Sequence, residues 1–169
     1  MVIGDYFFDI GKIKMENYTT AKAFMDKIMA YYESNQPELV VQVVESMSKE
    51  ALDTFYFGRD FLLGELAVAY NNLGRYDDAF NLLMSLEIDE DEEDYEWYYR
   101  VGFALYYLAE EDKDVARAWE KSLQAKQAFE DCLRYHPDKI FVEECKEFIE
   151  WINLDQAFYQ RGEKAPLRS

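Results

Sequence analysis

Residues 61–86 read FLLGELAVAYNNLGRYDDAFNLLMSL. The apolar residues of this stretch recur three and four positions apart, which is the spacing of one face of an α-helix. Gly74 interrupts the pattern at a point where glycine can end a helix, because it adopts the left-handed conformation at little steric cost. The stretch therefore predicts two helices around Gly74, one over 59–73 and one over 75–86.

The helical spacing continues on both sides of this pair, and few residues break it. The chain has 169 residues with only three prolines and seven glycines, a composition typical of one helical domain. Thr19 or Thr20 suits the N-cap of a helix, and Pro37 suits the first position of the helix that follows. Further helices are predicted over 20–34, 38–47, 97–108, 120–135 and 139–153.

Six residues of the opening stretch stand at offsets that let two helices cross closely. They are Leu66, Ala67, Tyr70, Gly74, Tyr76 and Ala79. Ala67 and Ala79 are small where the helices touch, and the two tyrosines fill the space between them. With these residues, segment 61–86 resembles a tetratricopeptide repeat (TPR). It departs from the family late, because Leu86 stands where alanine is usual and no proline closes the unit.

A second, interrupted repeat spans 97–137. Its first helix matches the family at Val101, Gly102, Ala104, Leu105 and Leu108, and its second at Ala125, Phe129, Leu133 and Pro137. The two halves are in register only if 11 extra residues lie between them. Because 11 residues make about three helical turns, such an insertion lengthens the hairpin and keeps its buried faces aligned.

The resemblance implies an all-α fold in which antiparallel helical hairpins stack as a short TPR-like α-solenoid. The expected parts of this single domain are an N-terminal arm at 1–17, a degenerate hairpin at 18–58, the units at 59–86 and 97–137, a capping helix at 139–153 and a frayed tail at 162–169. The arm fits either an extended segment or a short helix, and 48–58 fits a turn or a short helix that Gly58 ends. The alternative is a generic helical bundle.

The net charge of −17 limits the classes of partner that we expect. It repels nucleic acids and anionic membranes and attracts basic proteins. More than half of the excess lies in 59–109, which holds three basic and twelve acidic residues. Within it, Glu87–Glu96 is either a docking surface for a basic partner or a solvated loop. The candidate binding residues there are Asp89, Glu90, Asp91, Glu92, Glu93 and Asp94.

The resemblance also implies that a partner binds a concave surface lined by the first helix of each repeat. These positions are Phe61, Val68, Asn71, Asn72, Tyr99, Phe103, Tyr106 and Tyr107. Five of the eight are aromatic, the residue type that anchors protein interfaces, although aromatics at this spacing also suit a helical core. None is lysine or arginine, so the lysine clamp with which some family members hold a carboxylate is not expected.

Residues suited to catalysis, metals or cofactors are scarce. Cys132, Cys145 and His136 are too few and too scattered for a zinc site. The alternation of Asp89, Asp91 and Glu93 lacks the glycine and the bidentate glutamate of a calcium loop. No phosphate-binding loop or nucleophile motif occurs, so we expect no enzyme activity and no cofactor.

The sequence predicts a cytoplasmic protein. No apolar run is long enough to span a bilayer, and residues 1–10 have no basic region ahead of an apolar one, so no signal peptide is expected. Two cysteines without a disulfide pattern fit a reducing compartment.

These observations favour a non-enzymatic protein–protein interaction module. One concrete form is an acidic inhibitor or immunity protein that occludes a basic toxin. A second is a TPR adaptor or chaperone that holds a peptide in its concave groove. A third, from another class, is a metal-dependent enzyme that uses clustered carboxylates. Self-association through the aromatic surface is left open, whereas nucleic-acid and membrane binding are not expected.

Overall fold

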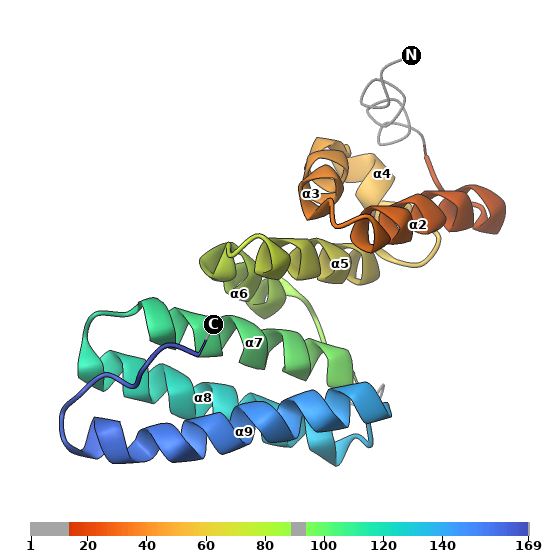
Figure 1. Cartoon of the computed structure of the whole chain (residues 1–169). Coiled ribbons are helices and arrows are strands. Elements are labelled where there is room, and N and C mark those ends of the chain that lie inside the picture. The colour runs from red at the N-terminus through yellow and green to blue at the C-terminus, as the bar shows by residue number, and fades with distance from the viewer. Residues whose placement is uncertain (1–13, 89–93, 169) are drawn as a thin grey trace. The chain divides into compact units, whose positions relative to one another are not determined.

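The computed structural model describes residues 14–88 and 94–168, and all regular secondary structure in them is α-helical (Figure 1). The helices are α2 (Tyr18–Glu33), α3 (Pro37–Ser46), α4 (Lys49–Asp53), α5 (Arg59–Asn72), α6 (Tyr76–Ser85), α7 (Tyr95–Glu111), α8 (Val115–Arg134) and α9 (Lys139–Gln160). Neighbouring helices pack against one another within each part of the chain, so the predicted all-α fold is confirmed. None of the described helices is long and apolar enough to cross a membrane.

The chain divides into two compact units between Arg75 and Tyr76. Unit 1 holds α2–α5 and unit 2 holds α6–α9. The division falls between the two helices of segment 59–86. The predicted arm at 1–17 lies outside the described residues except for its last four positions.

Unit 1 is built around α2, α3 and α5. Its largest fully buried side chains are Phe24, Met15, Ile28, Leu62, Val40 and Val44. Pro37 takes the first position of α3, as predicted. The predicted N-cap at Thr19 or Thr20 is wrong, because Asn17 caps α2 and its Oδ1 accepts the backbone N–H of Thr20 at 2.9 Å. The amide oxygen of Asn17 thereby satisfies a donor that the first helical turn leaves unpaired.

Gly74 ends α5 in the predicted left-handed conformation, with φ of 74°. Its N–H donates to Asn71 O at 3.1 Å, and the N–H of Arg75 donates to Tyr70 O at 2.8 Å, which is the Schellman pattern. The guanidinium of Arg75 lies 4.4 Å from the ring centre of Tyr70, and the Tyr70 hydroxyl donates to Glu45 of α3. The hydrogen bond from Tyr70 to Glu45 thus links the C-terminal end of α5 to α3.

Unit 2 is a long hairpin of α7 and α8 with α9 packed beside α8 (Figure 1). The inserted residues lengthen both helices, to 17 residues in α7 and 20 in α8. The predicted helix bounds near 108 and 120 are therefore wrong, since only residues 112–114 separate the helices. At the centre, the rings of Phe129 and Phe148 stack 4.7 Å apart, and a Cβ on Gly102 would come within 2.9 Å of the Phe129 ring.

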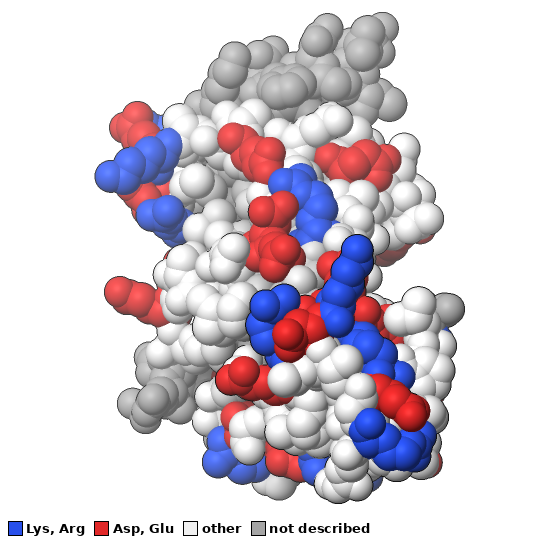
Figure 2. Space-filling model, turned by 90° about the vertical axis from the view of Figure 1, so that its left-hand side faces the viewer, with Lys and Arg blue, Asp and Glu red and all other residues white. Residues whose placement is uncertain are grey.

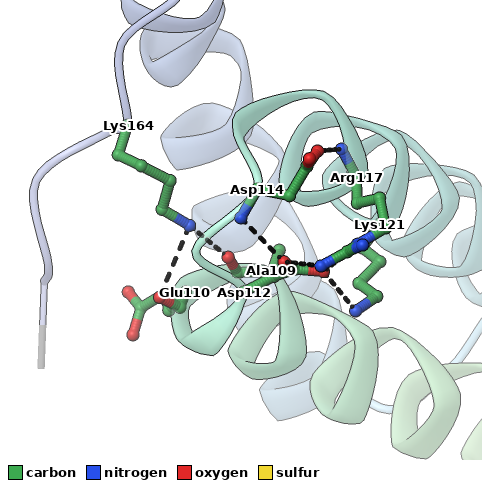
Figure 3. A network of polar contacts seen from close by, with 7 residues as sticks. All are labelled: Ala109, Glu110, Asp112, Asp114, Arg117, Lys121 and Lys164. Atoms are coloured by element: carbon green, nitrogen blue, oxygen red, sulfur yellow. Dashed lines mark hydrogen bonds and ion pairs between the residues drawn. The ribbon is translucent and has the colours of Figure 1, made fainter.

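Asp112 organises the turn between α7 and α8 (Figure 3). Its carboxylate accepts hydrogen bonds from Arg117 at 3.1 Å, from Lys121 at 2.8 Å and from the backbone N–H of Asp114 at 2.9 Å. Asp114 in turn caps α8 by accepting the N–H of Arg117 at 2.9 Å. The hydrogen bonds from Arg117 and Lys121 hold the pKa of Asp112 well below its usual range.

Asp112→Asn is expected to lower stability at pH 7, and the difference from the wild type should begin to shrink only below about pH 4, the ordinary pKa of an unfolded aspartate. A carboxyl whose pKa is depressed on folding stabilises the protein above its unfolded pKa, and that contribution is lost as the pH falls. Thermal melts of both proteins from pH 7 to pH 2 measure this. A difference that stays constant over the range would contradict the role given to the charge.

The last helix is longer than predicted. α9 continues past Asn153 to Gln160 and ends at Gly162, whose φ is 73°. The N–H groups of Gly162 and Glu163 donate to Tyr159 O and Phe158 O, both at 3.0 Å, which makes a second Schellman pattern. Residues 163–168 then return along unit 2, where the ammonium of Lys164 donates to Ala109 O (Figure 3). The tail predicted to be frayed is therefore held in place at Lys164.

Cys132 of α8 and Cys145 of α9 are free, fully buried thiols on two facing helices. A hydrogen bond between their side chains and burial together raise the pKa of the Cys145 thiol. His136 follows α8 in a left-handed conformation with φ of 51° and is exposed.

Candidate protein-binding surfaces

Four exposed aromatic side chains form one continuous cluster on unit 1. Phe61 is 49% exposed, Tyr18 and Tyr56 are each 52% exposed, and Phe57 is 36% exposed. The ring centre of Phe57 lies 6.1 Å from Phe61, 5.1 Å from Tyr56 and 5.8 Å from Tyr18. We call these four residues the Phe61 cluster. Exposed apolar groups gathered in this way are typical of surfaces that bind another protein.

The turn between α4 and α5 holds the Phe61 cluster in place. Phe55 is buried beneath it, with its ring centre 5.9 Å from that of Phe24. The N–H of Tyr56 donates to Met15 O at 2.8 Å, and Met15 is itself fully buried. Gly58 then adopts a φ of 96°, which a residue with a Cβ rarely tolerates. Aromatic rings fixed in this way lose little conformational entropy when a partner binds.

The other predicted residues of α5 differ in exposure. Asn72 is exposed and Val68 is half-buried, whereas Asn71 is buried. Only Phe61 among the four predicted α5 residues belongs to the aromatic cluster. The other three cluster members, Tyr18, Tyr56 and Phe57, were not predicted, although an aromatic pair directly before Gly58 is a signal that could have pointed to them.

The four predicted residues of α7 all contact aromatic rings within unit 2. Tyr106 is 3% exposed and packs 5.0 Å from Phe148 of α9. Phe103 lies 5.9 Å from the same ring, and Tyr107 stacks on Tyr76 of α6 at 5.0 Å. Phe103, Tyr107 and Tyr99 are half-buried. Tyr106 is therefore a core residue, whereas Tyr99, Phe103 and Tyr107 keep part of their surface exposed.

Tyr99 also links α7 to α9 through a polar contact. Its hydroxyl donates to Glu144, and its ring packs 5.1 Å from Phe141. Burial, followed by the hydrogen bond to Glu144, raises the pKa of the Tyr99 phenol. The hydroxyl therefore stays protonated and keeps its donor role over the whole physiological range.

Asp94 is the one residue of the predicted acidic binding set whose structure is described. It caps α7, because its Oδ1 accepts the N–H of Trp97 at 3.0 Å. The other predicted members, residues 89–93, lie outside the described residues. On the face shown in Figure 2, acidic and basic side chains of the described residues are intermixed. Asp94 thus has a structural role in starting α7.

Comparison with known proteins gives no relative from which to transfer a function. No family model, no curated protein and no solved structure matches the chain. The tetratricopeptide resemblance therefore stays a prediction. In residues 14–88 and 94–168, no group of three or more histidine, cysteine, aspartate or glutamate side chains is placed to hold a metal ion.

Proposed function

We propose that the protein is a non-enzymatic interaction module that binds a basic protein through the Phe61 cluster. The observation that carries this proposal is the contact among four aromatic rings that remain 36–52% exposed. Aromatic side chains of this kind supply most of the binding energy in many interfaces, because they desolvate a large area with few rotatable bonds.

Charge supports a basic partner. With 35 acidic and 18 basic residues, the chain attracts a cationic protein over distances of about a Debye length. Such a field raises the association rate, while the aromatic cluster slows dissociation. A protein that acts by occlusion needs both properties, so we further propose an inhibitor of immunity type that covers a basic toxin. Its free thiols fit a reducing compartment such as the cytoplasm.

The double substitution Tyr56→Ser, Phe61→Ser is expected to weaken partner binding by about 100-fold or more, because it removes two exposed anchors. The partner is first isolated from the native source with the wild-type protein as bait, and its affinity is then measured by calorimetry with purified components. Both side chains are about half exposed, so the variant should unfold at nearly the wild-type temperature.

The matched control is Met29→Ser, Leu73→Ser, which removes two apolar side chains of unit 1 that are 40% and 38% exposed and lie outside the cluster. It should leave the affinity within about threefold of the wild type. Equal losses in both variants, or a purified partner without net positive charge, would contradict the proposal.

A groove-binding adaptor remains the second candidate, favoured by the partial exposure of Phe103 and Tyr107. Tyr107→Ser separates the two functions: a groove-bound peptide should lose affinity with this change, whereas a partner bound through the Phe61 cluster should not.

A further inference from the structure

A buried polar site lies between α7 and α9 and holds an arginine side chain. Asp155 of α9 is 5% exposed, and one of its carboxylate oxygens accepts a hydrogen bond from the guanidinium of Arg168. The Tyr106 hydroxyl of α7 also bonds to that side chain. Glu110 accepts the backbone N–H of Arg168 at 3.5 Å and a hydrogen bond from Tyr106. We call this site the Asp155 pocket.

The arginine reaches the pocket on a segment that has no regular secondary structure. Residues 163–168 follow the end of α9 and cross to the last turn of α7, where Lys164 donates to Ala109 O and, at 3.4 Å, to Glu110 O (Figure 3). Leu167, the large apolar residue of this segment, is 67% exposed. Polar contacts of Lys164 and Arg168 therefore hold the segment, more than apolar burial does.

The pocket is unfavourable without a cation. Burial raises the pKa of Asp155 and of Glu110, and Arg168 opposes the rise in both. Two carboxyl groups and a phenol that converge in a largely buried space have lost much of their hydration, which a bound cation compensates. A guanidinium suits the site better than an ammonium, because its planar fork can donate to a carboxylate and a phenol together and is more weakly hydrated.

We propose that the Asp155 pocket is a binding site for an arginine side chain, which Arg168 occupies within the chain and which an arginine of a partner takes when residues 163–168 are released. The partner half of this inference rests on the proposed binding of a basic protein. The pocket itself rests on the contacts of Asp155, Tyr106 and Glu110. Residues 163–168 then act as an internal competitor that a partner with accessible arginines displaces.

Chemical rescue tests the pocket without any partner. The full chain with Arg168→Ala is titrated with ethylguanidinium, and its melting temperature is followed. We expect a saturable rise with half-effect at millimolar concentration, typical of so small a ligand. The wild type should show no such rise, and ethylammonium should stabilise the variant several-fold less. Equal responses to the two cations, or no rise with either, would overturn the proposal.

Two more variants serve as a specificity control and as a replacement if the first variant does not fold. Adding Asp155→Asn to Arg168→Ala should abolish the rescue, since the carboxylate that receives the guanidinium is gone. If Arg168→Ala does not fold, Arg168→Gln takes its place, because its neutral amide can form hydrogen bonds in the pocket without supplying a cation. Ethylguanidinium should stabilise Arg168→Gln, and the absence of any rise would overturn the proposal.

The peptides Gly-Arg-Gly and Gly-Lys-Gly, blocked at both ends, test access by another chain. In calorimetry the arginine peptide should bind Arg168→Ala at least about tenfold more tightly than the lysine peptide, and more tightly than it binds the wild type. Equal binding of the two peptides would refute the use of the pocket by a partner. This result is independent of the Phe61 cluster, so failure of the pocket and failure of the proposed function are told apart.

Discussion

Phe129→Ala is expected to lower the free energy of unfolding of unit 2 by about 3–5 kcal/mol. The Phe129 ring is fully buried, stacks on Phe148 at 4.7 Å and lies 5.9 Å from Tyr99, so its removal leaves a cavity where all three helices of the hairpin and cap meet. The measurement is urea unfolding followed by tryptophan fluorescence. All three tryptophans, Trp97, Trp119 and Trp151, belong to unit 2, so the signal reports that unit.

Leu123→Ala is the matched control on the same helix, because Leu123 is 45% exposed and its loss should change stability by no more than about 1 kcal/mol. A double-mutant cycle sharpens the test. Gly102→Ala should destabilise the wild type by forcing the Phe129 ring to move, yet be neutral or stabilising once Phe129 is alanine. Additive effects of the two changes would show that the close approach of Gly102 and Phe129 does not limit packing.

Arg168→Ala is expected to lower the free energy of unfolding by about 3 kcal/mol at pH 7, at the low end for a broken buried ion pair because a fifth of the Arg168 side chain is exposed. The loss has a pH dependence. Burial already raises the pKa of Asp155, and removal of Arg168 raises it further, so the charged carboxylate destabilises the folded variant above that pKa. Acidification to about pH 4 protonates Asp155 and should narrow the difference from the wild type.

Arg161→Ala is the control for this second prediction. Arg161 pairs with Glu163 at the surface with more than half of its side chain exposed, and such pairs contribute at most about 1 kcal/mol. Unfolding curves of both variants at pH 7, 5.5 and 4 measure the effect. A loss in Arg168→Ala that does not change with pH would contradict the role given to Asp155.

Local signals predicted most of the helices. Gly74 ends α5 and Pro37 begins α3 through the backbone geometry of these two residues alone. Because such local geometry does not depend on tertiary contacts, both predictions are confirmed. The end of α9 was missed because Asp155 occupies a buried position five residues before the helix end, and a carboxylate there interrupts the apolar pattern of the helix face. Its charge is compensated by Arg168, a contact that residue spacing within the helix does not reveal.

The candidate binding surface was predictable only in part. Phe61 was one of the positions that the tetratricopeptide resemblance implied. Tyr18 and the pair Tyr56 and Phe57 come from two other segments and meet Phe61 only because Met15 anchors the turn before α5. The helix ends next to the inserted residues were not predicted, because the turn is confined to residues 112–114 by hydrogen bonds that Asp112 and Asp114 accept, which residue spacing does not reveal.

The two buried thiols allow the opening motions of unit 2 to be measured by the rate at which they react with a thiol reagent. A thiol reagent in solution can reach Cys132 or Cys145 only during moments when the facing surfaces of α8 and α9 part. The labelling rate of the native protein therefore counts those openings, and its ratio to the rate in denaturant gives their free energy. A ligand that stabilises the packing of α9 against its neighbouring helices would lower this labelling rate. Partners of unit 2 can therefore be detected without knowing where they bind.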